Sequence, residues 1–178
     1  MSDITSLAFQ RENKPKIEDV IPLCVAGEYQ KSALGFVAWL RTNKMAPGWS
    51  GVHNAWDAKC KGSTICKISI GYGERDIAGR PNKHSWEIKL YCYHQDRYAE
   101  SIVNEGLQSI VWNGLYTCVG CLGGKKPCIG GSNHTVYGKE FKGICGYSFG
   151  TRIYDPDEAT VESIKRMLEL EQKARIAG

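Results

Sequence analysis

The chain has 178 residues, a formal net charge of +4, and proportions of hydrophobic (42%) and charged (24%) residues that are ordinary for a folded protein. No apolar run approaches the ~18 residues of a membrane-spanning helix. The N-terminal sequence lacks the charged-then-apolar order of a signal peptide, so we expect a cytoplasmic protein without a membrane partner. The isoelectric point near 8.6 falls short of the concentrated basic surface typical of nucleic-acid-binding proteins, and nucleic acid is not an expected partner.

The first part of the chain predicts a helix followed by a hairpin. Residues 1–18 are mostly polar and predict a flexible N-terminal tail, which leaves residues 19–178 as a single expected domain. Apolar residues at helical spacing predict a helix from Glu28 to Asn43. Alternating residues then predict two strands, Val52–Lys59 and Thr64–Tyr72, joined by a Lys-Gly-Ser turn.

Three further elements follow from local signals. Apolar and polar residues alternate over Ser85–Tyr93 and predict a third strand. Asp96 is a suitable N-cap for a second helix over about Arg97–Val111, which we expect to be interrupted or bent at Gly106. The run Asp155-Pro156-Asp157-Glu158 combines a cap, a first-turn proline and an acid, and therefore predicts the start of the last helix.

A short internal match suggests a duplication. Residues 65–71, Ile-Cys-Lys-Ile-Ser-Ile-Gly, resemble residues 144–150, Ile-Cys-Gly-Tyr-Ser-Phe-Gly. We expect a second hairpin, over 135–137 and 143–153, to close the sheet. The expected fold is thus α+β, with an antiparallel sheet built from two helix–hairpin units, helices on one face, and a zinc-knuckle-like Cys-rich loop at 116–146.

This cysteine-rich segment carries the clearest local chemistry. Cys118-Val-Gly-Cys121 presents two thiols from one tight turn, and Cys128 and Cys145 follow. Paired thiolates of this kind bind tetrahedral zinc, and the neighbouring glycines let the backbone fold closely around a small centre. In a reducing compartment the eight cysteines of the chain are expected to be thiols or metal ligands. We predict a structural zinc bound by Cys118, Cys121, Cys128 and Cys145.

Other residues are also candidates for the fourth zinc ligand. The duplication would make Cys145 an inward-facing strand residue, which favours His134 instead, and Cys60 is a further candidate. An open coordination position would make the site that of a zinc or thiol enzyme. A thioredoxin-like redox role is disfavoured, because here the Cys-x-x-Cys motif follows a helix and precedes a Gly-rich loop.

The chain has five tryptophans and nine tyrosines, several of which fall near one another in the expected sheet. The predicted ligand-binding residues are Trp49, His53, Trp56, Trp86 and Trp112. Together they would line an aromatic pocket between the sheet and the helices, suited to a planar or cationic small molecule. The alternative interpretation is that these tryptophans are core and interface residues.

Several segments carry a resemblance to known proteins. They are Leu34-Gly-Phe-Val-Ala-Trp-Leu-Arg41 with Asn43-Lys-Met-Ala-Pro47, the stretch from Trp56 to Ile70, and Asn104-Glu-Gly-Leu107 through Trp112 to Cys121. Together they resemble a group of small bacterial α+β domains of uncharacterised function. The architecture is also similar to effector-binding domains of bacterial regulators, and this likeness implies a sensor of small molecules that stands alone or partners a regulator.

The sequence therefore predicts a sensor-like, small-molecule-binding domain with a structural zinc. An acid such as Asp57 or Glu87 would orient the ligand. The common enzyme motifs Gly-x-Ser-x-Gly, His-Glu-x-x-His and the Walker loop do not occur, so an enzyme is not favoured. Two alternatives stay open: a zinc- or thiol-dependent enzyme that uses the same cysteines, and a module that presents the zinc loop to a protein partner.

Overall fold

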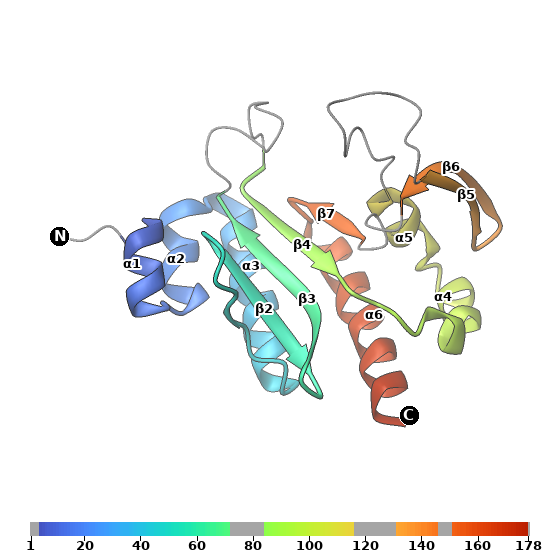
Figure 1. Cartoon of the computed structure of the whole chain (residues 1–178), viewed down its shortest axis with the longest axis horizontal. Coiled ribbons are helices and arrows are strands. Elements are labelled where there is room, and N and C mark those ends of the chain that lie inside the picture. Colours follow the sequence, from blue (N-terminus) through green and yellow to red (C-terminus); the bar gives the residue numbers. More distant parts are fainter. Residues whose placement is uncertain (1–3, 72–83, 116–130, 146–150, 178) are drawn as a thin grey trace.

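A five-stranded antiparallel sheet with strand order β1-β2-β3-β4-β7 forms the centre of the molecule (Figure 1). The computed structural model describes residues 4–71, 84–115, 131–145 and 151–177. The strands are β1 (Gly48–Trp49), β2 (Ala55–Cys60), β3 (Ser63–Ile70), β4 (Trp86–Leu90), β5 (Gly131–Val136), β6 (Lys139–Cys145) and β7 (Arg152–Tyr154). The helices are α1 (Leu7–Asn13), α2 (Ile17–Cys24), α3 (Gly27–Thr42), a short 3₁₀ helix (Gln95–Tyr98), α4 (Ala99–Asn104), α5 (Gln108–Gly114) and α6 (Glu158–Ala177). The α+β class and the antiparallel sheet are as predicted.

The core lies between one face of this sheet and helices α3 and α6, which run behind β2–β4 in Figure 1. Alternation places Trp56, Ile68 and Ile88 at matching positions of three neighbouring strands, all fully buried. Burying a large apolar side chain in this way contributes about 1.5–3 kcal/mol. The helices supply Phe36, Leu40, Ile164, Met167 and Leu168 to the same core.

The second hairpin does not close the main sheet. Strands β5 and β6 pair with each other in a separate two-stranded sheet, and only β7 joins the main one, beside β4. The physical reason is composition, because much of the described ribbon is polar and exposed, as at Ser132, Asn133 and Lys139, although Val136 and Tyr137 pack against the core. Trp112 attaches the ribbon to α5, since its Nε1 donates to the carbonyl oxygen of Val136 at 2.7 Å.

The described residues do not form two equivalent helix–hairpin units. Residues 65–70 lie in β3, which is paired on both sides in the main sheet, whereas Ile144 and Cys145 end β6 in the other sheet. Residues 146–150 of the proposed repeat lie outside the described residues. A match of seven residues does not by itself require equivalent places in the fold.

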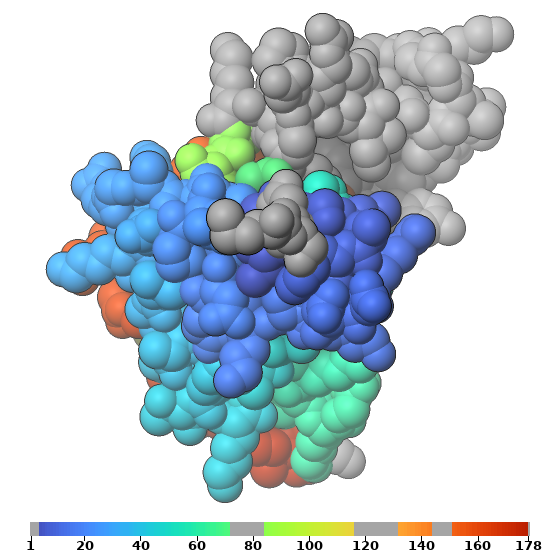
Figure 2. Space-filling view, turned by 90° about the vertical axis from the view of Figure 1, so that its left-hand side faces the viewer, coloured from blue at the N-terminus to red at the C-terminus, as the bar shows by residue number. Residues whose placement is uncertain are grey.

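The N-terminal segment also differs from the expected flexible tail. It forms α1 and α2, whose atoms make one continuous surface with α3 in Figure 2. Ile17 is fully buried, and the carbonyl oxygen of Pro15 accepts a hydrogen bond from Trp56 Nε1 at 2.9 Å. Gln10 is fully buried too, and its Oε1 accepts from the backbone N–H of Asn54 at 2.8 Å. Gln10 and the carbonyl group of Pro15 thus serve as hydrogen-bond partners for groups at the start of β2, which a composition argument does not detect.

Two predicted helix boundaries can be compared with the structure. The predicted break at Gly106 is confirmed: Gly106 has φ of +69°, and α4 ends before it while α5 begins after it. The last helix begins at Glu158, and Asp157, rather than Asp155, caps it by accepting from the N–H of Thr160 at 2.8 Å. In the described part of the chain, no helix has the length and apolarity needed to cross a membrane.

Candidate functional site

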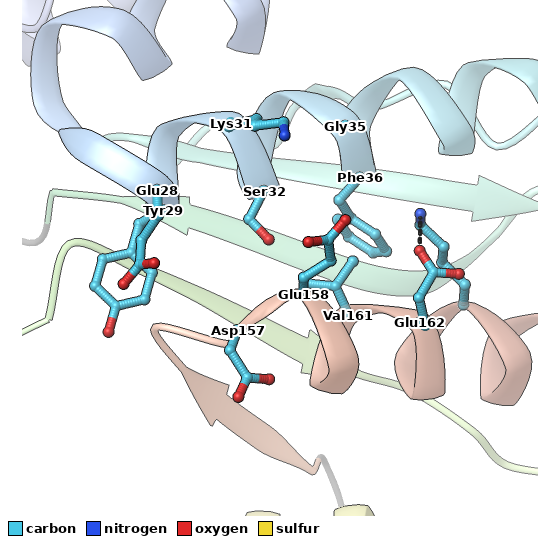
Figure 3. A pocket seen from close by; sticks show the side chains of 11 residues that line it. Glu28, Tyr29, Lys31, Ser32, Gly35, Phe36, Asp157, Glu158, Val161 and Glu162 are labelled. Atoms are coloured by element: carbon cyan, nitrogen blue, oxygen red, sulfur yellow. Dashed lines mark hydrogen bonds and ion pairs between the residues drawn. The ribbon is translucent and has the colours of Figure 1, made fainter.

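A groove of about 430 Å³ runs between the first halves of α3 and α6 (Figure 3). Ser32 and Phe36 point from α3 toward α6, and Glu158 and Val161 point back from α6 (Figure 3). The volume lies within the range of small-molecule sites. The lining residues are Glu28, Tyr29, Lys31, Ser32, Gly35, Phe36, Asp157, Glu158, Val161, Glu162 and Lys165.

Small residues on one stripe of α3 keep this groove open. Ser32 and Gly35 lie where larger side chains would fill the gap between the helices, and a Cβ added at Gly35 would meet no atom within 4 Å. Phe36 and Val161, both buried, supply an apolar floor. The opposite ends of the two helices are joined, because Gln172 Nε2 donates to the carbonyl oxygen of Asn43 at 3.0 Å.

The groove is acidic. Four carboxylates and two lysines line it, and one of those lysines, Lys165, pairs with Glu162 at 2.6 Å. Asp157 caps α6, and this hydrogen bond to Thr160 holds the pKa of its carboxyl below the ordinary value. Glu28 and Glu158 have no lysine or arginine within ion-pair distance in the described residues, so the lining carries unbalanced negative charge.

One polar atom at the groove lacks a partner. The hydroxyl of Ser32 is buried and makes no hydrogen bond within the described part of the chain. A buried hydroxyl without a partner loses about 1–3 kcal/mol of solvation. In Figure 3 this side chain points from α3 toward α6, on the side where the groove lies.

Two of the residues predicted for the aromatic pocket lie in the core. Trp56 and Trp86 share one face of the sheet, as expected, but they are 0% and 1% exposed in the core. Trp49 lies opposite Trp56 in the β1–β2 pair. His53 Nε2 lies 2.6 Å from the carbonyl oxygen of Thr5, and Trp112 holds the β5–β6 ribbon. Packing against α3 fills the space that a pocket would need, as the 6.4 Å separation of the Phe36 and Trp86 rings illustrates.

The predicted zinc ligands are only partly within the described residues. Cys118, Cys121 and Cys128 lie outside them, and the backbone of Cys145 ends β6 opposite Gly131. His134 Nε2 lies 2.7 Å from Ser132 Oγ, and Cys60 is buried at the end of β2. No group of three or more His, Cys, Asp or Glu side chains suited to a metal occurs among residues 4–71, 84–115, 131–145 and 151–177. The zinc site therefore stays a prediction.

Sequence reasoning missed the groove. Its available signal is the pair Ser32 and Gly35, two small residues about one turn apart in the amphipathic helix α3. Such residues are common in helices, and only the position of α6 shows that they leave open space.

Comparison of this chain with protein-family models, with curated proteins and with solved structures found no match. The resemblance to small bacterial α+β domains therefore stays a prediction. The function has to be argued from the chemistry of the groove and of the remaining polar surface.

Proposed function

We propose that the protein is a small-molecule-binding domain whose ligand is an organic cation held in the groove between α3 and α6. The observation that carries the proposal is the unbalanced charge of the groove, where Glu28 and Glu158 lie without a cationic partner in the described residues, above an apolar floor. An ammonium group would balance this charge and donate hydrogen bonds to the carboxylate oxygens. Its hydrocarbon part would lie on Phe36 and Val161.

The ligand needs both an ammonium group and a hydrocarbon part. Glu28 and Glu158 are exposed to water, and an exposed ion pair contributes only about 0–1 kcal/mol. Most of the affinity must therefore come from apolar surface removed from water, at about 25 cal/mol per Å². Alkylammonium and arylammonium compounds are thus better candidates than ammonium or small inorganic cations.

A screen of alkyl- and arylammonium compounds by two-dimensional NMR tests the proposal. We expect saturable shifts at groove residues, binding that weakens in Glu158→Gln, and no binding in Gly35→Leu, whose side chain fills the groove. Glu100→Gln is the matched control, because Glu100 is also an exposed acid in the first turn of a helix. Absence of binding across the screen, or equal binding by the Gly35→Leu variant, would refute the proposal.

A structural zinc is a second part of the proposed function. Supporting it is the pairing of Cys145 with Gly131, a residue that follows Cys128 by three positions in the sequence. His134 is a weaker fourth ligand, because its Nε2 is engaged with Ser132 Oγ. Four thiolate ligands would make the site structural rather than catalytic.

Zinc analysis of protein purified under reducing conditions tests this second part. We expect about one zinc per chain, loss of zinc in Cys128→Ser and Cys145→Ser, and retention in His134→Ala. A fully folded, metal-free protein with free thiols would contradict it. Three protein ligands and a water would instead favour the zinc enzyme.

A further inference from the structure

The sheet face opposite the helices carries a row of charged side chains. Register places Asp57, Lys67, Lys89 and Arg152 side by side on the four neighbouring strands β2, β3, β4 and β7. No described helix covers this face of β2–β4, which is turned toward the viewer in Figure 1. The row is therefore a separate feature from the groove, which lies on the helical side.

Three adjacent members of the row are cations. Lys67 lies directly opposite Lys89, and Lys89 lies directly opposite Arg152. Facing residues on antiparallel strands have Cβ atoms about 4.5–5.5 Å apart, and like charges at this separation are destabilising. A sheet face selected only for stability would alternate the signs of such charges.

Nearby carboxylates balance the charges of Lys67 and Arg152 better than that of Lys89, which lies between them. Asp57 lies 3.5 Å from Lys67, and Glu87 lies 3.6 Å from Arg152. Within the described residues Lys89 has no carboxylate at ion-pair distance, and its ammonium lies 5.0 Å from the centre of the Tyr91 ring. The central lysine is thus the place where an added negative charge would have the greatest effect.

Partial burial strengthens these interactions. The side chains of Lys67 and Arg152 are only 26% and 34% exposed. Burial, together with the charge of Arg152, holds the pKa of Lys89 below its ordinary value. Burial raises the pKa of Glu87. Charges in such a setting are screened less by water than fully exposed ones.

We propose that Lys67, Lys89 and Arg152 form a binding site for a multivalent oxyanion of the phosphate class, with Lys89 at its centre. Such an anion has several acceptor oxygens and a charge of more than one, so it can bridge neighbouring cations that a single carboxylate cannot. Binding would relieve the repulsion between the three side chains. A phosphorylated small molecule is the ligand class that this arrangement fits.

Calorimetric titration with pyrophosphate and with inorganic phosphate, at constant ionic strength set with KCl, tests the site. We expect saturable binding that Lys89→Gln weakens about tenfold or more. Lys59→Gln removes the same charge from an exposed position on β2 outside the row, and should change binding by less than about twofold. Equal weakening by both variants, or binding of acetate as tight as that of pyrophosphate, would overturn the proposal.

Thermal unfolding gives a second, independent readout. Without phosphate, Lys89→Gln should unfold at a higher temperature than the wild type, because it removes the repulsion between Lys89 and its two cationic neighbours. With phosphate the wild type should gain more stability than the variant, because the variant binds phosphate more weakly. A variant that is less stable without phosphate, and that phosphate stabilises as much as the wild type, would show that Lys89 is only a structural residue of the sheet.

Discussion

Glu171 and Arg175, one turn apart on α6, form an ion pair inside the protein: Glu171 Oε1 lies 2.8 Å from Arg175 Nε, and the side chains are 0% and 6% exposed. Glu171 also accepts from Tyr98 OH at 2.7 Å and from His94 Nδ1 at 2.8 Å. Arg175 donates to the carbonyl oxygen of Tyr91 at 2.7 Å. The pair thus ties the C-terminal half of α6 to the chain that leaves β4.

Glu171→Gln should destabilise the protein by about 3–5 kcal/mol, because it leaves Arg175 buried without a counter-charge. Urea unfolding of both proteins measures the difference. Glu169→Gln is the control on the same helix, since the partly exposed Glu169 pairs with Arg166, and it should change stability by about 0–1 kcal/mol. Equal effects of the two substitutions would show that the buried pair has no special role.

The same carboxylate should contribute to the pH dependence of stability. Burial alone would raise the pKa of Glu171, but hydrogen bonds from His94, Arg175 and Tyr98 outweigh it and leave the pKa below its ordinary value. A lowered pKa in the folded state gives stability that is present above the unfolded pKa of about 4.3 and is lost as the pH falls through the folded pKa. The stability difference between the wild type and Glu171→Gln should therefore be constant near neutral pH and shrink in acid. A difference that stays unchanged down to the acid limit of folding would contradict this assignment.

Two glycines should respond to alanine in opposite ways. Gly35→Ala should stabilise the protein by about 0.5–1 kcal/mol, because its Cβ meets no atom within 4 Å and alanine favours the helix. Gly114→Ala should destabilise it by about 1–3 kcal/mol, because its Cβ would lie 2.1 Å from Thr151 Cγ2 and 3.0 Å from the backbone nitrogen of Arg152. Thermal unfolding of the two variants gives the signs directly, and a stable Gly114→Ala protein would mean that α5 does not pack against β7 in this way.

Gln10→Ala tests whether the N-terminal helices belong to the folded domain. The substitution removes the acceptor of the Asn54 backbone N–H, a buried hydrogen bond of 2.8 Å, and should destabilise the protein by about 1–3 kcal/mol. Glu12→Ala, at an exposed position of the same helix, should stay within about 0.5 kcal/mol of the wild type. If both variants unfold like the wild type, α1 does not contribute to the stability of the domain.

The sequence alone determined the elements whose signals are local. Strand alternation through Trp56, Ile68 and Ile88 predicts which side chains share a face, because successive residues of a strand point to opposite sides. Helical spacing predicts α3, and Gly106 predicts the break before α5, because glycine reaches positive φ with little strain. These are properties of a few neighbouring residues.

The roles of the side chains on these elements depend on how the elements pack against one another. Whether Trp56 and Trp86 line a pocket or fill the core depends on how closely α3 packs over them. The separation between α3 and the sheet cannot be read from a local sequence pattern. Asp155 is a residue type that often caps helices. Its carboxylate instead accepts hydrogen bonds from the N–H groups of Ser85 and Trp86 at 2.8 and 3.0 Å, because β7 brings it beside β4. The charged row centred on Lys89 likewise exists only in this register, since a slip of one residue would turn each side chain of a strand to the other face.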